Sequence, residues 1–436
     1  MNFNKLNEKK RLVKGQLIVG LDLAKTNHVA VPMLPDGVVF GKPIRFTQSR
    51  ASFDDLFSRC QEICQKGEAT GIMFAMEATG SYWEPLARHF AEKPVNLVFV
   101  AGSVVKRTRR MMDLSRSKND PKDAYIIAQV ASEGKMMRIN APTGIWAELR
   151  NFGFLRGDLV KDSVAWGNRI RSIQEKFWPE RETALKDVLL KTSLFLLKKC
   201  PFPDDVLRLG KPGLLELVLE GSNKRKSQRV TDQIWLAAQD SIGVRDGQEA
   251  AKWELLQAID LVDTLQKKIT EVDAKLTDLA RATGYLEPLE SIPGLSAVGA
   301  ALLLAEVGDP SRYRNAKEWV KLAGLNLIEN QSGKTKLGEG KRISKVGRPV
   351  LRHVLYTLSF PLLRHNPEFK AAHLSMRNDG KHPMKGIIAA MCRLLRVSFS
   401  LCKTKQLYCS NPDSPAKIKR LQDEIEARKA VKRAAA

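Results

Sequence analysis

The segment that decides the fold is QLIVGLDLAKTNHVAVPML, which occupies residues 16–34. Its two apolar runs, QLIVGLDLA and HVAVPML, are separated by a short polar turn and predict two consecutive β-strands. A third predicted strand, VVFGKPIRF at residues 38–46, follows the turn Pro35-Asp36-Gly37. Three strands joined by such short turns predict a meander, because strands that follow one another closely in sequence usually pair.

The elements that follow alternate between helix and strand. A helix is predicted to begin near Ser52, GIMFAMEAT at residues 71–79 is a buried strand, SYWEPLARHFAEK is a helix, and VNLVFVAG at residues 95–102 is another buried strand. Three meandering strands followed by helix, strand, helix and strand is the order of a ribonuclease H-like domain. We therefore expect an α/β domain of this class over residues 16–140, preceded by a basic tail over residues 1–15.

The strand signals fade after this domain, and the rest of the chain is predicted to be helical. A heptad seam predicts a long helical hairpin or coiled coil, and its pattern suits an internal helix pair and a dimer contact equally well. The seam consists of Leu255, Ala258, Val262, Leu265, Ile269, Val272, Leu276 and Leu279. We expect a helical region with an insertion at residues 141–285, a mostly helical C-terminal domain at 286–408 and a charged tail at 409–436.

The C-terminal domain opens with PLESIPGLSAVGAALLLAEVG at residues 288–308. Two apolar helices flank a Pro293-Gly294 turn, which resembles a helix-hairpin-helix, a motif that directs backbone N–H groups at a phosphate. Ser296 occupies the place of the second glycine of that motif. Contact with DNA and simple helix packing are both compatible with this pattern.

The charge of the chain indicates a polyanionic partner. The 72 Lys and Arg residues exceed the 48 Asp and Glu residues, which gives a formal net charge of +24, while 43% hydrophobic residues predict a folded protein. No run of 18 apolar residues and no signal-peptide pattern is present, so we expect no membrane partner and a cytoplasmic location.

Four acidic residues suggest a metal site. Asp22 lies within the first predicted apolar strand and Glu77 at the end of the next buried one, while Asp120 and Asp123 lie three apart at a predicted helix start, where they share one face. Carboxylates without His or Cys suit hard cations, above all Mg²⁺, and two such ions can promote phosphodiester chemistry. Two alternatives remain: Asp120 is only a helix cap, or the acidic groups form a solvated edge.

Two basic segments accompany these acidic residues and predict contact with a phosphate backbone. The first precedes Asp120 and contains Lys106, Arg107, Arg109, Arg110, Arg116 and Lys118. The second surrounds Ser332 and contains Lys334, Lys336, Lys341, Arg342, Lys345, Arg348 and Arg352. A hydroxyl on such a loop is a candidate nucleophile for a phosphodiester, although an isolated serine more commonly shapes a turn. ATP binding is disfavoured, because Ile328 stands where a phosphate loop ending at Thr335 needs glycine.

Six motifs together resemble the insertion-sequence 110/1111 family of bacterial transposases. They are GLDLAKTNHVAV, EATGSYWEPLA, KNDPKDAYIIAQ, SIPGLSAVGAALLLAEVGD, KLAGLNLIENQSG and RISKVGRPVLRHVLY. The resemblance implies a RuvC-like domain with Asp22, Glu77, Asp120 and Asp123 as a Mg²⁺-binding catalytic tetrad. It also implies that Ser332 is the nucleophile that forms a 5′-phosphoserine intermediate with DNA.

The resemblance extends to partners. It implies a structured bridge RNA that pairs with target and donor DNA, and a homo-oligomer, dimer or tetramer, in which the tetrad of one subunit meets the serine of another. The cell compartment implied is the bacterial cytoplasm, in association with the nucleoid. Two other hypotheses fit the residues: a junction-resolving nuclease that uses metal-activated water, and a non-catalytic nucleic-acid-binding protein.

Overall fold

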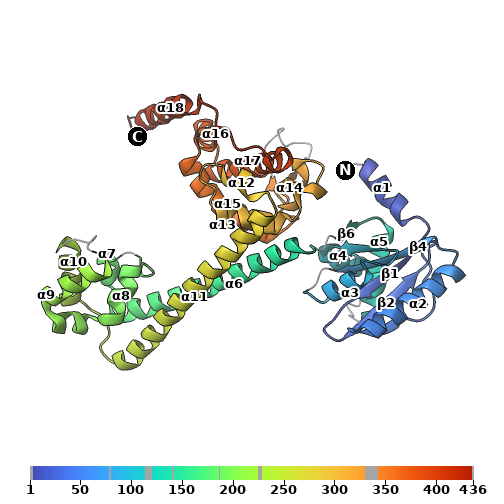
Figure 1. Ribbon diagram of the computed structural model, residues 1–436, viewed down its shortest axis with the longest axis horizontal. Coiled ribbons are helices and arrows are strands. Elements are labelled where there is room, and N and C mark those ends of the chain that lie inside the picture. The colour runs from blue at the N-terminus through green and yellow to red at the C-terminus, as the bar shows by residue number, and fades with distance from the viewer. Residues whose placement is uncertain are drawn as a thin grey trace. The chain divides into compact units, whose positions relative to one another are not determined.

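The computed structural model describes residues 3–77, 80–112, 120–139, 142–185, 187–223, 228–328 and 342–434. The chain forms two compact units, Met1–Pro142 and Thr143–Ala436 (Figure 1). The first is a mixed α/β unit and the second is largely helical. Both features were predicted from the sequence.

The first unit is built on a six-stranded sheet with the order β3-β2-β1-β4-β5-β6. Strands β1, β4 and β5 run parallel, and β2, β3 and β6 pair antiparallel to their neighbours. The strands are β1 (Gln16–Asp22), β2 (Asn27–Met33), β3 (Ile44–Thr47), β4 (Gly71–Glu77), β5 (Val95–Val100) and β6 (Met136–Arg138). The third strand is shorter than its predicted range of 38–46, because Gly41 has a φ of +72° and Pro43 has no N–H to donate.

Helices cover both faces of this sheet. They are α1 (Phe3–Val13), α2 (Arg50–Lys66), α3 (Trp83–Phe90), α4 (Gly102–Met112) and α5 (Asp120–Ser132). Leu21 and Met76 belong to the core beneath α2 and α3, whereas Ile18, Met73 and Val100 belong to the core beneath α4 and α5. Parallel strands covered on both faces are apolar throughout, which explains the long apolar runs in the sequence. The segment predicted as a tail contains helix α1, whose Val13 is buried in the second of these cores.

Glycine allows helix α5 to pack closely on β1. A Cβ atom added at Gly20 would lie 2.0 Å from the carbonyl oxygen of Ala124 and 2.7 Å from the nitrogen of Ala128. Ala124 also packs on Val29 and Val31, whose register partners on β1 are Asp22 and Gly20. The start of α5 therefore lies over the carboxyl end of β1.

The second unit contains a long helical hairpin, a group of small helices and a C-terminal helical core. The helices from the hairpin to the small group are α6 (Ile145–Phe177), α7 (Arg181–Ala184), α8 (Lys191–Lys199), α9 (Pro203–Gly221), α10 (Gln228–Gln239) and α11 (Gln248–Ala282). The remaining elements are α12 (Leu286–Glu290), α13 (Ala297–Val307), η1 (Pro310–Arg312), α14 (Ala316–Leu322), β7 (Leu327–Ile328), β8 (Arg342–Ile343), α15 (Pro349–His365), α16 (Pro367–Asn378), α17 (Pro383–Thr404) and α18 (Ser414–Ala434).

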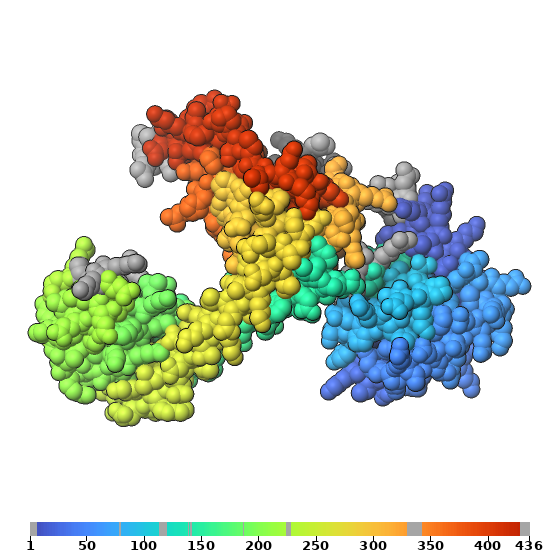
Figure 2. Space-filling model, viewed as in Figure 1, coloured from blue at the N-terminus to red at the C-terminus, as the bar shows by residue number. Residues whose placement is uncertain are grey.

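Helices α6 and α11 pack side by side in antiparallel directions (Figure 2). Arg156 on α6 forms an ion pair with Asp273, and Arg169, farther along α6, pairs with Glu254 near the start of α11. The seam residues Leu255, Val262 and Leu276 are fully buried. The structure supports the interpretation of this seam as an internal helix pair, and a dimer contact there stays a prediction.

The half-buried Pro293-Gly294 turn packs against α15. Gly294 has a φ of +91°, and a Cβ atom at this position would lie 2.7 Å from the carbonyl oxygen of Pro361 on α15. Ser296 caps α13 by accepting a hydrogen bond from the nitrogen of Gly299 at 3.1 Å. The turn has a clear packing role, while a phosphate contact there stays a prediction. No helix in the described part of the chain is long and apolar enough to cross a membrane.

Candidate active site

Two of the predicted acidic residues lie at the same edge of the sheet. Asp22 and Glu77 are the last residues of the parallel neighbours β1 and β4, and the residues before them, Leu21 and Met76, are register partners. Leu21 and Met76 face α2 and α3, and strand residues alternate between faces. Asp22 and Glu77 therefore both face the side covered by α4 and α5.

The side chain of Glu77 lies against the start of α4. A Cβ atom added at Gly102 would lie 2.1 Å from Oε1 of Glu77 and 2.8 Å from its Cδ, so a larger residue here would displace this carboxylate from its position. The N-terminus of a helix also favours a negative charge. Gly102 was not predicted as a site residue, although a glycine directly after a buried strand was a visible signal.

The two predicted aspartates of α5 differ in their surroundings. Asp120, the first residue of the helix, is exposed, whereas Asp123 is only 3% exposed. Nη2 of Arg109 on α4 lies 2.6 Å from Oδ1 of Asp123. This contact is an ion pair by distance, but it lacks the geometry of a hydrogen bond, so Asp123 Oδ1 and Arg109 Nε remain buried without a hydrogen-bond partner. The buried carboxylate of Asp123 therefore requires a nearby positive charge, which Arg109 provides.

Arg109 was predicted to contact nucleic acid, and its position indicates a different role. Its guanidinium is half-buried and directed at Asp123, while Lys106, Arg107 and Arg110 on the same helix are exposed. These three cations remain available for a phosphate backbone. Arg116 and Lys118 lie outside the described residues.

The four carboxylates do not form a closed metal cage. Among the described residues, no three His, Cys, Asp or Glu side chains are close enough together to hold one ion. The structure brings Asp22 and Glu77 to one strand edge and the start of α5 over it, and it pairs Asp123 with Arg109. Whether the tetrad binds metal stays a prediction.

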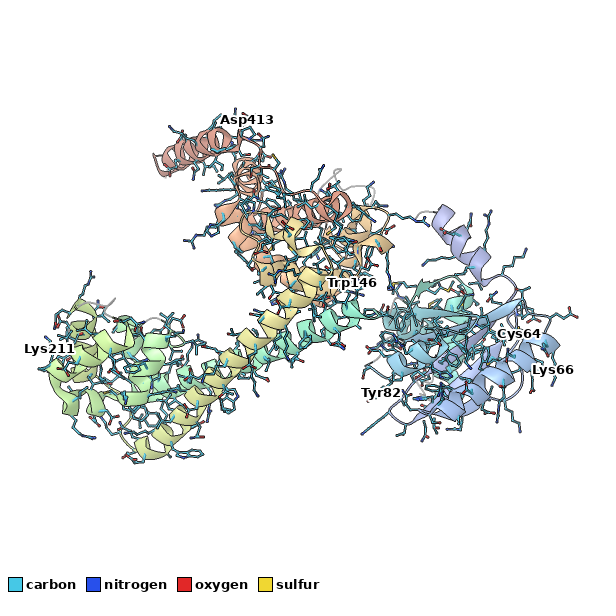
Figure 3. The ribbon with its side chains drawn as sticks, viewed as in Figure 1. Cys64, Lys66, Tyr82, Trp146, Lys211 and Asp413 are labelled. Carbon is cyan, nitrogen blue, oxygen red and sulfur yellow. The ribbon has the colours of Figure 1, made fainter. Side chains whose placement is uncertain are left out.

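A buried histidine fixes the turn that follows Asp22. Nδ1 of His28 accepts a hydrogen bond from the nitrogen of Ala24 at 3.2 Å, so Nε2 carries the proton and donates to Oε1 of Gln48 at 2.6 Å. Gln48 in turn donates to the carbonyl oxygen of Tyr82 at 3.1 Å; Tyr82 is labelled in Figure 3. Burial lowers the pKa of the His28 imidazole, which keeps the ring neutral. Sequence reasoning missed this residue because a single histidine in a strand carries no signal.

The predicted nucleophile Ser332, together with Lys334, Lys336 and Lys341, lies outside the described residues. The described chain on either side is paired, since Leu327 and Ile328 on β7 are register partners of Ile343 and Arg342 on β8. Arg342, which belongs to this pairing, and Lys345, which follows it, are both exposed. The segment that contains Ser332 is therefore flanked on both sides by the paired strands β7 and β8.

Arg348 and Arg352 were predicted to contact nucleic acid, and both make hydrogen bonds within the protein. Arg348 donates to the carbonyl oxygen of Glu306, and Arg352 donates to the carbonyl oxygen of Ala323 at 3.0 Å. Burial lowers the pKa of Arg348 and raises the pKa of the Glu306 carboxyl, and the charges of the two groups partly offset these effects. These contacts fix the chain that leads out of β8 into α15.

Comparison with known proteins identifies the family. A model of DEDD-type IS110 transposases, described as a transposase, matches residues 19–179, and a model of the transposase IS116/IS110/IS902 family matches residues 286–374. The chain belongs to the IS110 family of transposases. The first match includes the four predicted carboxylates, and the second includes Ser332.

Relatives of this IS110-family transposase extend over nearly its whole length. It is 24% identical over 400 residues to the uncharacterized 43.6 kDa protein of insertion element IS110 from Streptomyces coelicolor, covering 90% of this chain and 95% of that protein. It is 25% identical over 398 residues to the uncharacterized 44.8 kDa protein of IS116 from Streptomyces clavuligerus, covering 90% and 96%. A shorter match, 29% identical over 140 residues, links 31% of this chain to 43% of the pilin gene-inverting protein of Moraxella bovis. The transposase is a DNA recombination enzyme.

Proposed function

We propose that this IS110-family transposase cuts and rejoins DNA strands with Ser332 as nucleophile and with Mg²⁺ held by Asp22, Glu77, Asp120 and Asp123. The observation that supports the role of the carboxylates is the parallel pairing of β1 and β4, at whose ends Asp22 and Glu77 lie on one face of the sheet. The antiparallel meander β3-β2-β1, continued by parallel β4 and β5, supports a ribonuclease H-like class for this unit. The family match over residues 286–374 supports the serine half.

The donor chemistry fits a hard divalent cation, since all four side chains offer carboxylate oxygens. The buried Oδ1 of Asp123 already faces the guanidinium of Arg109, so this position accommodates a positive charge. When bound, a pair of Mg²⁺ ions would activate the attacking oxygen and stabilise the leaving oxygen. Asp22 and Glu77 would hold the ions from the strand ends, and Asp120 and Asp123 from the start of α5.

The reaction conserves phosphodiester bonds. Attack of the Ser332 hydroxyl oxygen on a DNA phosphorus forms an Oγ–P bond and breaks the bond between phosphorus and O3′. The serine proton ends on O3′, which becomes a free 3′-hydroxyl, while the 5′-phosphate stays on the protein. Attack by the 3′-hydroxyl of another strand reverses these changes, releases the serine and needs no external energy source.

A trapping experiment tests this proposal. DNA carrying an element end and labelled at one 5′ or one 3′ terminus is incubated with protein and Mg²⁺ and resolved on denaturing gels. We expect a protein adduct on the 5′-phosphate side that Ser332→Ala and Asp22→Asn both abolish and that the matched control Ser375→Ala retains. Mg²⁺-dependent cleavage by Ser332→Ala without an adduct would instead favour a nuclease that uses water. Recombination that persists in Ser332→Ala and Asp22→Asn would support the non-catalytic hypothesis.

The proposal includes partners. The net charge of +24 suits a second nucleic acid in addition to DNA. We propose that this second nucleic acid is a structured bridge RNA that guides the transposase to its DNA sites. We also propose a homo-oligomer, dimer or tetramer, acting on nucleoid DNA in the bacterial cytoplasm. Ribonuclease treatment before the trapping assay should abolish adduct formation, and sedimentation of the protein with and without RNA should report the assembly.

A further inference from the structure

The C-terminal helical core contains a groove of about 1500 Å³ that neither the tetrad nor the serine explains. Its lining comes from α14, β7, β8, the first turns of α15, the end of α16 and α17. Pockets for small molecules usually measure about 300–1,000 Å³. The groove is therefore large for a metabolite and suits a segment of a polymer.

The described lining of the groove is mostly apolar, and all of its charged side chains are basic. Its six cations are Arg342, Lys345, Arg352, Lys381, Lys385 and Arg396. Lys381 pairs with Asp379 at 3.4 Å, outside the lining. Lys385 and Arg396 are exposed and form no ion pair with any carboxylate in the described part of the chain. Such a lining is complementary to a phosphate backbone.

Aromatic side chains form a stripe along the exposed face of α15. His353 and Tyr356 line the groove, and Phe360 follows one turn later with its ring 5.0 Å from that of Tyr356 at an interplanar angle of 88°. Tyr356 is 36% exposed and Phe360 49% exposed, whereas the solvent face of a helix is normally polar. Met384 on α17 is another exposed apolar side chain of the lining.

Cations beside exposed aromatic rings are what an unpaired nucleic-acid strand requires. Its phosphates need positive charge, and each of its bases presents a flat face for stacking. A duplex keeps its bases stacked on one another and would leave the aromatic stripe unused. The groove also begins at β7 and β8, the strands that lead into the segment containing Ser332.

We propose that this groove binds an unpaired DNA strand, with bases stacked on Tyr356 and phosphates held by Lys385 and Arg396. The proposal rests on the proposed function, since DNA rather than RNA is chosen because the strand to be cut must reach the serine. It adds to that function that the DNA duplex is unpaired where the C-terminal helical core binds it.

Binding without catalysis tests the proposal. Fluorescence anisotropy in EDTA measures the affinity of the full-length protein for a labelled DNA strand of about 12 nucleotides, within the usual site size. We expect Tyr356→Ala to weaken binding about 5- to 150-fold, as for the loss of one stacked base, and Tyr356→Phe to retain it. Lys385→Gln should weaken binding and reduce the salt slope by about 0.7, while the control Lys419→Gln on α18 should change neither.

A second measurement locates the strand. A DNA strand that carries 5-iododeoxyuridine, which crosslinks to aromatic side chains on irradiation, should react at the α15 peptide in wild type and in Ser332→Ala, and not in Tyr356→Ala. Circular dichroism confirms that each variant is folded. Equal affinity of Tyr356→Ala and wild type, or crosslinks confined to other peptides, would overturn the proposal. Tighter binding of the matching RNA, with the same dependence on Tyr356, would overturn the choice of DNA.

These outcomes are independent of the proposed function. Failure to trap a Ser332 adduct leaves the EDTA measurements intact, because they require no cleavage. If the binding test shows no strand in the groove, the proposal that Ser332 forms an adduct with DNA still stands. The two proposals can therefore fail separately.

Discussion

Arg109 and Asp123 form an ion pair between α4 and α5, with Nη2 of the arginine 2.6 Å from Oδ1 of the aspartate. The same carboxylate is a predicted metal ligand, and its Oδ1 accepts no hydrogen bond. A divalent cation at Asp123 and the guanidinium would therefore compete for one oxygen. Loss of the arginine removes that competitor and also leaves a buried carboxylate without compensation.

Arg109→Gln should make stability depend on Mg²⁺. In EDTA we expect a loss of about 3–5 kcal/mol, the usual cost of removing one partner of a buried pair. Added Mg²⁺ should raise the melting temperature of Arg109→Gln more than that of wild type, because binding to the folded state stabilises it. Calorimetry with a Mg²⁺ titration measures this, with Arg110→Gln on the exposed face of the same helix as control. Equal Mg²⁺ responses in wild type and Arg109→Gln would show that the arginine does not compete with metal.

Gly102→Ala should disturb Glu77. The new methyl group would overlap the carboxylate, which lies 2.1 Å from its position, so the side chain must move or α4 must shift. We expect a stability loss of about 1–3 kcal/mol together with loss of the DNA adduct. Thermal unfolding and the trapping assay report the two effects. Ser103→Ala, one residue farther along α4, should alter neither; full adduct formation by Gly102→Ala would remove Glu77 from the mechanism.

His28 should make the turn after Asp22 sensitive to acid. Burial lowers the pKa of the ring in the folded protein below its ordinary value of 6.5. The folded state thus prefers the neutral ring, so its stability is complete above pH 6.5 and declines as the pH falls through the lowered pKa. His28→Asn should show a smaller decline over this range in unfolding melts collected at several pH values. An unchanged slope would mean that other groups cause the acid sensitivity.

Glu306 should act in the opposite sense. Burial raises the pKa of this carboxyl above 4.5, so the folded state holds its proton more tightly than the unfolded state does. Stability is then complete below pH 4.5 and declines as the pH rises through the raised pKa. Glu306→Gln, which leaves the carbonyl that Arg348 contacts in place, should therefore gain stability near neutral pH and not in acid. The exposed Glu290→Gln serves as control in the same melts, and a destabilised Glu306→Gln at neutral pH would contradict the prediction.

The sequence predicted the architecture of the first unit because its signals are local. Apolar runs such as residues 16–24 and 71–79 identified the buried strands that carry Asp22 and Glu77, and the structure shows that both residues end their strands at one edge of the sheet. The mixed sheet and the helical remainder are confirmed. The shortened β3 shows the limit of the method, since apolar residues 38–40 resemble a strand until Gly41 and Pro43 interrupt it.

The contacts that the sequence did not predict join distant segments. Nothing in the run of cations at residues 106–110 distinguishes Arg109 from its neighbours, because only the packing of α4 on α5 turns it toward Asp123. His28 and Gln48 meet across strands for the same reason. The groove beside α15 likewise depends on residues from six separate elements, and the spacing of His353, Tyr356 and Phe360 along α15 was its local sign in the sequence.

The ladder between β1 and β4 imposes a parity rule on changes in chain length. Because side chains alternate, one residue inserted between Gly71 and Glu77 would rotate the carboxylate into the apolar core beneath α2 and α3. Two inserted residues would return the carboxylate of Glu77 to the original side of the sheet, but would shift it about two residues along the strand, past the level of Asp22. Gains and losses of sequence among related transposases should therefore collect in the connections, such as residues 34–43, and spare the seven residues of each of these two strands.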